Sequence, residues 1–128
     1  PKAGRRLIDS FWPGQVTLIF EATQSLSTKL TGGSGKIGVR LVRHPIAVQL
    51  LKAVNRPLTG TSANVSGQPG CTAISELDLT VIEAVDLVLD SGPLQGGQGS
   101  TVVDVTADLP VVIREGAVAA TRIASALP

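Results

Sequence analysis

Strand-like and helix-like segments alternate along this chain, except that its last two strand-like segments follow each other directly. Runs of apolar and β-branched residues predict strands over residues 15–20, 37–41, 58–59, 85–89, 101–106 and 111–114. Helical periodicity and terminal signals predict helices over residues 2–11, 45–54, 74–84 and 117–127. Crossover helices suit parallel strands, whereas a hairpin across residues 107–110 requires an antiparallel pair. We therefore expect an α+β (α/β-like) fold, a twisted mixed β-sheet with helices on its faces.

The core of such a fold has to be aliphatic in this chain. Hydrophobic residues make up 43% of the 128 residues but aromatic residues only 2%, so Val, Leu, Ile and Ala must fill it. The helix over 45–54 carries Ile46, Leu50 and Val54 and is expected to be buried. A chain of this length fits one domain, so we expect residues 1–128 to form a single domain.

Several features limit the class of protein. No apolar run approaches the ~18 residues of a membrane span, and no signal-peptide pattern opens the chain. Cys71 is the only cysteine and His44 the only histidine, which excludes a disulfide framework and a cysteine-based zinc site. A reducing, cytoplasmic setting is expected. The absence of Met and the start at Pro1 lead us to expect a piece of a longer protein, with part of its site upstream.

The charge is distributed unevenly. Residues 1–57 contain nine Lys/Arg and two Asp/Glu, whereas residues 58–128 contain two and eight. A basic half favours an anionic ligand such as ATP or RNA. The alternative is that the two halves pair with each other across the fold, and both interpretations stay open.

Three polar loops are candidates for a binding site: residues 31–36, 59–67 and 91–101. The segment from Thr59 to Gly67 has five small hydrogen-bonding side chains and two glycines, which suits a small polar ligand. Loops at strand ends collect ligands in open α/β sheets, so we expect the three loops to converge. None contains a known phosphate fingerprint, and the alternative is that they are ordinary turns.

Two arginines lie in otherwise apolar segments, and no residue is predicted to be catalytic. Arg40 and Arg114 each need a carboxylate or phosphate partner there, either a ligand or a structural partner such as Asp90 or Asp104. No G-x-S-x-G elbow surrounds a serine. His44 precedes a helix and Cys71 has no neighbouring base, so neither is expected to be reactive.

The order of these pieces resembles the YrdC-like domain of threonylcarbamoyl-AMP synthases over roughly residues 5–120. The segments that carry the resemblance are Phe11-Trp12-Pro13-Gly14-Gln15-Val16-Thr17, Gly38-Val39-Arg40 with His44-Pro45, Thr61-Ser62-Ala63-Asn64-Val65-Ser66-Gly67, Gly99-Ser100-Thr101-Val102-Val103-Asp104 and Ile113-Arg114-Glu115-Gly116-Ala117. The Ser-Ala-Asn-x-Ser-Gly and Ser-Thr-Val-Val-Asp segments are the most specific.

The resemblance implies a fold, a reaction and partners. The fold would be YrdC/RibB-like and incomplete at its N-terminus, because the family's N-terminal part is absent from this chain. The family condenses L-threonine, bicarbonate and ATP into threonylcarbamoyl-AMP and pyrophosphate, normally with Mg²⁺. A partner enzyme then transfers the threonylcarbamoyl group to an adenosine of tRNA. A fragment without the N-terminal part is not expected to turn over.

The resemblance also implies roles for particular residues. Arg40 and Ser100 would bind threonine, with Arg40 on its carboxylate. The ATP-binding residues would be Lys36, Gly60, Thr61, Ser62, Asn64, Gly70 and Arg114. This chain departs from the common family pattern at Gln15, Gly60, Gly70 and Glu115; the last puts a negative charge beside a phosphate site.

Two alternatives stay open from the sequence. One is a YrdC-like paralogue that binds nucleotide, double-stranded RNA or tRNA by shape without forming this product. The other is a carbamoyl-transfer domain of a larger enzyme, which would use carbamoyl phosphate instead of bicarbonate.

Overall fold

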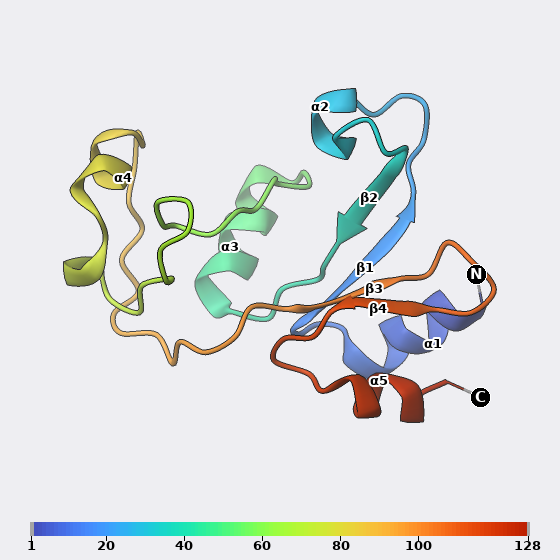
Figure 1. The fold of residues 1–128 in the computed structure, drawn as a ribbon. Coiled ribbons are helices and arrows are strands. Elements are labelled where there is room, and N and C mark those ends of the chain that lie inside the picture. Colours follow the sequence, from blue (N-terminus) through green and yellow to red (C-terminus); the bar gives the residue numbers. More distant parts are fainter. Residues whose placement is uncertain (1, 128) are drawn as a thin grey trace. The chain divides into compact units, whose positions relative to one another are not determined.

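The structure is a computed structural model that describes residues 2–127 (Figure 1). The chain divides into two compact units. The first comprises the residues up to His44 and from Gln98 onward, and we call it the sheet unit. The second is Pro45–Gly97, the insert unit. The expectation that residues 1–128 form a single domain stays a prediction.

The sheet unit contains a four-stranded mixed sheet in the order β2-β1-β3-β4. Its strands are β1 (Val16–Glu21), β2 (Lys36–Val39), β3 (Thr101–Asp104) and β4 (Val111–Arg114). β1 is antiparallel to β2 and parallel to β3, while β3 and β4 form an antiparallel hairpin. The predicted mixed sheet and its hairpin are thus confirmed.

An aliphatic core lies on one face of this sheet, as the composition requires. Val16, Leu18, Val103 and Val105 are fully buried there together with Leu7 and Ile123. The last two come from α1 (Lys2–Phe11) and α5 (Ala120–Ser125), which cover the same face (Figure 1). Alternation along β1 places Thr17 and Ile19 on the opposite face.

Most predicted elements of the sheet unit form, with shifted boundaries. The helix predicted over 117–127 is limited to α5, and the strands predicted over 37–41 and 101–106 are limited to β2 and β3. Arg40 therefore follows β2 instead of lying within a strand. A short helix, α2 (Thr28–Thr31), was not predicted; Ser27 caps it and Gly32 ends it in the left-handed region at φ 57°.

The insert unit has little regular structure and no buried residue among positions 45–97. It contains α3 (Pro45–Val54), a 3₁₀ turn (Ile74–Glu76) and α4 (Leu79–Glu83). α3 begins at the predicted proline, but its predicted burial is wrong, because Ile46, Leu50 and Val54 are each about 40% exposed. No described helix is long and apolar enough to cross a membrane.

Three further predictions in the insert unit are wrong. The helix predicted over 74–84 is interrupted because the Asp78 side chain accepts a hydrogen bond from Thr80 N and so starts a new helix. Residues 58–59 and 85–89 form no strand. Apolar composition is not enough for a strand, which needs a hydrogen-bonded neighbour, and no described backbone group pairs with residues 86–91.

Candidate functional site

The topology of the sheet brings three predicted site residues to one edge. β1 and β3 are parallel and begin at this edge, whereas the antiparallel strands β2 and β4 end there. Ser100 directly precedes β3, Arg40 directly follows β2, and Arg114 is the last residue of β4. We call this group the arginine edge.

Ser100 is held from two sides at the arginine edge. Its hydroxyl lies 2.8 Å from the Thr17 hydroxyl, and its carbonyl accepts a hydrogen bond of 2.9 Å from Nη2 of Arg114. Arg40 and Arg114 are both exposed, and the only ion pair among the described residues does not involve either. Two guanidinium groups are therefore presented at this edge without a described carboxylate partner.

A buried threonine fixes the backbone behind this edge. Thr101 is fully buried; its hydroxyl donates to Val118 O (2.5 Å) and accepts from Gly116 N (2.9 Å) and Val118 N (3.1 Å). Gly116 packs so closely that a Cβ there would lie 2.1 Å from Gly99 O. The segment after Arg114 is thus locked onto the segment that carries Ser100.

Glu115, one of the departures from the family pattern, has a structural partner. Its Oε2 accepts a hydrogen bond of 3.0 Å from Ala120 N, at the first residue of α5. A carboxylate at a helix N-terminus is favourable because it satisfies a free backbone N–H and meets the positive end of the helix dipole.

Lys36 lies at the opposite edge of the sheet from the arginine edge. Its Nζ donates to Asp104 Oδ2 (2.9 Å) and to Thr106 Oγ1 (2.8 Å). Asp104, a candidate partner for Arg40 or Arg114 from the sequence, thus pairs with Lys36 instead. Asp90 accepts from Gly92 N within its own loop (2.8 Å). The structure does not bring Lys36 together with Arg40 and Ser100.

The hydrogen bonds to Asp104 shift two pKa values. Thr106 donates to Asp104 Oδ1 from its hydroxyl (2.6 Å) and its backbone N–H (2.8 Å). The Thr106 hydroxyl and then Lys36 lower the pKa of Asp104 to about 2. In turn, the hydrogen bond to Asp104 raises the pKa of Lys36. This cluster was not predicted from the sequence. The Asp104-x-Thr106 spacing could have indicated it, because an aspartate side chain often accepts a hydrogen bond from the residue two positions on.

The predicted convergence of three loops is wrong for the loop over 31–36 and the 98–101 part of the third loop, which both belong to the sheet unit. The loop over 31–36 returns at the far end of β1, where Ala22 N donates to Gly35 O (2.8 Å) and Glu21 pairs with Lys36. The segment that ends in Ser100 lies at the start of β1, where Thr101 N donates to Gln15 O (3.1 Å). The whole length of β1 separates them.

The insert unit groups the other predicted residues in one loop. Asn64 shapes it: Nδ2 donates to Val65 O (3.0 Å) and to Gln68 O (2.9 Å), and Gly67 takes the left-handed conformation at φ 85°. Gly60, Thr61, Ser62 and Gly70 are exposed. This loop is therefore an ordered turn that leaves hydroxyl and backbone groups open to solvent.

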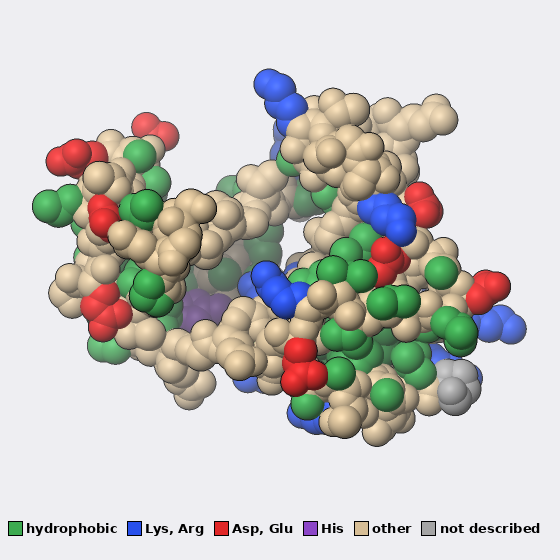
Figure 2. Space-filling view, viewed as in Figure 1, with side chains coloured by type: hydrophobic (Ala, Val, Ile, Leu, Met, Phe, Trp, Pro, Cys, Tyr) green, Lys and Arg blue, Asp and Glu red, His purple; other side chains and the backbone are tan. Residues whose placement is uncertain are grey.

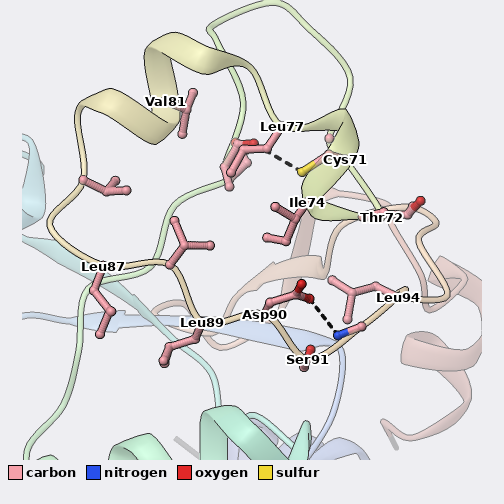
Figure 3. A pocket seen from close by; sticks show the side chains of 17 residues that line it. Cys71, Thr72, Ile74, Leu77, Val81, Leu87, Leu89, Asp90, Ser91 and Leu94 are labelled. Carbon is pink, nitrogen blue, oxygen red and sulfur yellow. Dashed lines mark hydrogen bonds between the residues drawn. The ribbon is translucent and has the colours of Figure 1, made fainter.

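A mostly apolar pocket of about 500 Å³ lies within the insert unit beside this loop (Figure 3). Ser62, Gly70 and Cys71 contribute one part of its lining, and the rest includes Ile74, Leu77, Val81, Leu87, Leu89 and Leu94. Cys71 Sγ contacts Ala63 O at 3.7 Å, and Leu94 N donates to Thr72 O (2.8 Å). The pocket was not predicted from the sequence. Its apolar lining comes largely from residues 74–84 and 85–89, which were interpreted as a helix and a strand.

The surface of the insert unit is rich in exposed apolar side chains. Leu79 and Leu87 are 71% and 74% exposed, and Figure 2 shows such side chains next to acidic ones around α4. Among residues 2–127, no group of three His, Cys, Asp or Glu side chains could hold a metal ion.

Comparison with known proteins identifies the family. A family model for the Sua5, YciO and YrdC proteins, described as "Telomere recombination", matches residues 1–116. A curated protein of Mycobacterium tuberculosis is 37% identical over 127 residues, which are 99% of this chain and 58% of that protein. The threonylcarbamoyl-AMP synthase of Pyrococcus abyssi is 33% identical over 116 residues, 91% of this chain and 34% of that protein. The chain belongs to the Sua5/YciO/YrdC family.

Solved structures agree with this assignment. The crystal structure of P. abyssi Sua5 complexed with L-threonine superposes with a TM-score of 0.88 at 31% identity, covering 99% of this chain and 37% of that one. The structure of E. coli YciO has a TM-score of 0.76 at 32% identity, covering 88% and 55%. The YrdC-like α+β fold is thereby confirmed. The chain spans about 58% of the length of the mycobacterial relative.

Proposed function

We propose that this chain is the part of an L-threonylcarbamoyladenylate synthase that binds the carboxylate of L-threonine and contributes to the ATP site. The reaction joins L-threonine, bicarbonate and ATP into threonylcarbamoyl-AMP and releases pyrophosphate, in the modification of tRNA. The observation that carries the proposal is the arginine edge, where Arg40 and Arg114 flank Ser100 without a described carboxylate partner. Guanidinium groups bind carboxylates and phosphates in a planar, two-bonded geometry.

At the arginine edge, different residues bind the two substrates. Arg40 holds the threonine carboxylate, and the Ser100 hydroxyl hydrogen-bonds the same ligand. Arg114, whose Nη2 is engaged by the Ser100 carbonyl, turns its remaining donors to the ATP phosphates. The reaction needs little covalent help from the protein, because aligning the amine, the carboxylate and the phosphates lowers the barrier. The complex of P. abyssi Sua5 with L-threonine supports this substrate.

The rest of the ATP site is assigned to the insert unit and to Lys36. Gly60, Thr61, Ser62, Asn64 and Gly70 would contact the nucleotide through hydroxyl and backbone groups, and Lys36 through its backbone. Mg²⁺ would enter with the ATP phosphates as part of the substrate. We place the enzyme in the cytoplasm, with a tRNA-modification enzyme as the recipient of its product.

The test is binding by the 128-residue chain, which does not depend on turnover. L-Threonine and ATP are titrated separately into ¹⁵N-labelled protein, with D-threonine as the control for the first. We expect L-threonine to shift the amides of Arg40 and Ser100, and ATP to shift those of Thr61, Ser62 and Asn64. Equal responses to D- and L-threonine would contradict the proposal.

A second candidate is a paralogue that binds nucleotide or RNA without using threonine. The charge of the sheet unit, nine Lys/Arg against five Asp/Glu, supports it, because a basic surface suits an anionic nucleotide or RNA whether or not threonine binds. An ATP response with no threonine response would support this candidate. In any longer protein that contains this chain, threonine-dependent pyrophosphate release in the presence of bicarbonate separates the two.

A further inference from the structure

Thr17 has a hydroxyl group that the proposed site does not yet use. It lies between Val16 and Leu18, whose side chains are fully buried in the core, so its own side chain is on the opposite face of the sheet. There its Oγ1 lies 2.8 Å from the Oγ of Ser100. This is a hydroxyl–hydroxyl hydrogen bond between residues 83 positions apart in sequence.

The backbone places Thr17 between the two residues assigned to threonine. On one side, Leu18 pairs with Val39 and Gly14 N donates to Leu41 O (2.8 Å), which holds Arg40 alongside the start of β1. On the other side, Val16 pairs with Thr101, which places Ser100 next to the same residues. Gly38 faces Thr17, and alternation continued two residues further along the chain puts Arg40 on the same face.

The side chain of Thr17 is itself held in place. A Cβ added to Gly38, in the neighbouring strand, would lie 3.2 Å from the Thr17 methyl group, so the absence of a side chain at residue 38 leaves room for that methyl. A β-branched residue has few χ1 options, and the hydrogen bond to Ser100 favours the one in which the two hydroxyls meet. The Thr17 hydroxyl is thus a fixed hydrogen-bond partner for Ser100.

We propose that Thr17 is a positioning residue of the threonine site: its hydroxyl fixes the rotamer of Ser100, so that the remaining hydrogen-bonding capacity of Ser100 Oγ points to the ligand beside Arg40. This inference rests on the proposed function. A serine hydroxyl otherwise samples three staggered positions, and ordering it in advance removes an entropic cost from binding. The carbonyl of Ser100 is already held by Arg114, so rotation of its side chain about χ1 is the motion that remains to be restricted.

The experiment compares three variants of the 128-residue chain. Thr17→Val keeps the shape and removes the hydroxyl, and Thr17→Ser keeps the hydroxyl. Thr23→Val is the matched control, because Thr23 forms an exposed hydroxyl pair with Ser25 (2.9 Å) outside the site. Two quantities are measured: the three-bond couplings that report χ1 of Ser100 without ligand, and the Kd of L-threonine from titration.

We expect Thr17→Val to average the Ser100 couplings and to raise the Kd of L-threonine about 3- to 10-fold, the size of one hydrogen bond. Thr17→Ser and Thr23→Val should leave the couplings unchanged and the Kd within about 2-fold, and the ATP response should persist in all variants. If Thr17→Val does not fold, Gly38→Ala displaces the Thr17 methyl and should show the same two changes, more weakly.

The outcomes separate this inference from the proposed function. If the wild-type chain binds L-threonine and Thr17→Val leaves either the couplings or the Kd unchanged, the positioning role is wrong while the proposed function stands. If the wild-type chain does not bind L-threonine, the proposed function is wrong and the role of Thr17 in a threonine site is wrong with it.

Discussion

Among residues 2–127, Asp104 is the one whose ionisation is most altered by its surroundings. Its lowered pKa, about 2 against an ordinary 3.8, means that the folded protein binds the proton less readily than the unfolded chain. The ionised carboxylate therefore contributes stability above pH 3.8, and this contribution is lost as the pH falls from 3.8 through about 2. The largest cause is the hydrogen bond from the Thr106 hydroxyl.

We predict that Thr106→Val raises the pKa of Asp104 towards its ordinary value. The variant loses the hydroxyl donor that favours the ionised form, while the backbone N–H of residue 106 remains. Side-chain ¹³C shifts followed over pH measure the midpoint directly. Thr80→Val is the matched control, because Thr80 makes the same two hydrogen bonds to Asp78. An Asp104 midpoint that is equal in wild type and Thr106→Val would contradict the assigned cause.

Arg40 tests the division of substrates at the arginine edge. We predict that Arg40→Ala raises the Kd of L-threonine on the order of 10- to 100-fold, the range for hydrogen bonds to a charged group, and changes the ATP response little. Isothermal titration with each ligand measures both. Arg43→Ala is the control, since Arg43 is an exposed arginine three positions further on. Equal losses for both ligands would make Arg40 a structural residue.

At the scale of elements, the turn after β4 depends on a glycine. We predict that Gly116→Ala lowers the free energy of unfolding by about 1–3 kcal/mol, because its Cβ would overlap Gly99 O at 2.1 Å and Ser100 C at 2.8 Å. Urea denaturation measures the change. Gly70→Ala, whose Cβ would have no atom within 4 Å, should have little effect. A tolerated Gly116→Ala would mean that the turn can move away from Ser100.

Elements that depend on local signals could be predicted from the sequence. α1 carries its core residue Leu7 at helical spacing, and the alternation of Val16 and Leu18 defines β1. Residues 85–89 were predicted as a strand on apolar content alone, and they form none because no described strand pairs with them. Asp78 could have been recognised as a helix cap, which would have divided the helix predicted over 74–84.

The candidate site was predictable only in part for a similar reason. Arg40, Ser100 and Arg114 were selected by motif, and the topology places all three at one edge. Thr17 and Thr101 were not selected, because a hydroxyl gains its partner through the register between strands distant in sequence. Sequence spacing does not contain that register.

At the scale of the whole molecule, charge and burial separate the two units. The sheet unit carries nine Lys/Arg and five Asp/Glu, and the insert unit two and five. The basic balance of the sheet unit suits the anionic substrates proposed for the arginine edge. All six residues of the hydrophobic core also belong to the sheet unit, so its stability should differ from that of the insert unit.

We predict that the two units differ strongly in hydrogen exchange and in sensitivity to core truncation. Leu18→Ala should lower the free energy of unfolding by about 2–5 kcal/mol, because a fully buried leucine is lost from the core. Leu50→Ala is the matched control: Leu50 is 39% exposed, and we expect a cost below about 1 kcal/mol.

Hydrogen exchange should separate the units in the same way. Amides of β1 and β3 should exchange slowly, whereas those of residues 86–91, which pair with no described backbone group, should be among the fastest-exchanging amides of the protein. Strong protection of residues 86–91 would mean that this segment pairs as a strand in solution, and a large effect of Leu50→Ala would mean that α3 is buried there.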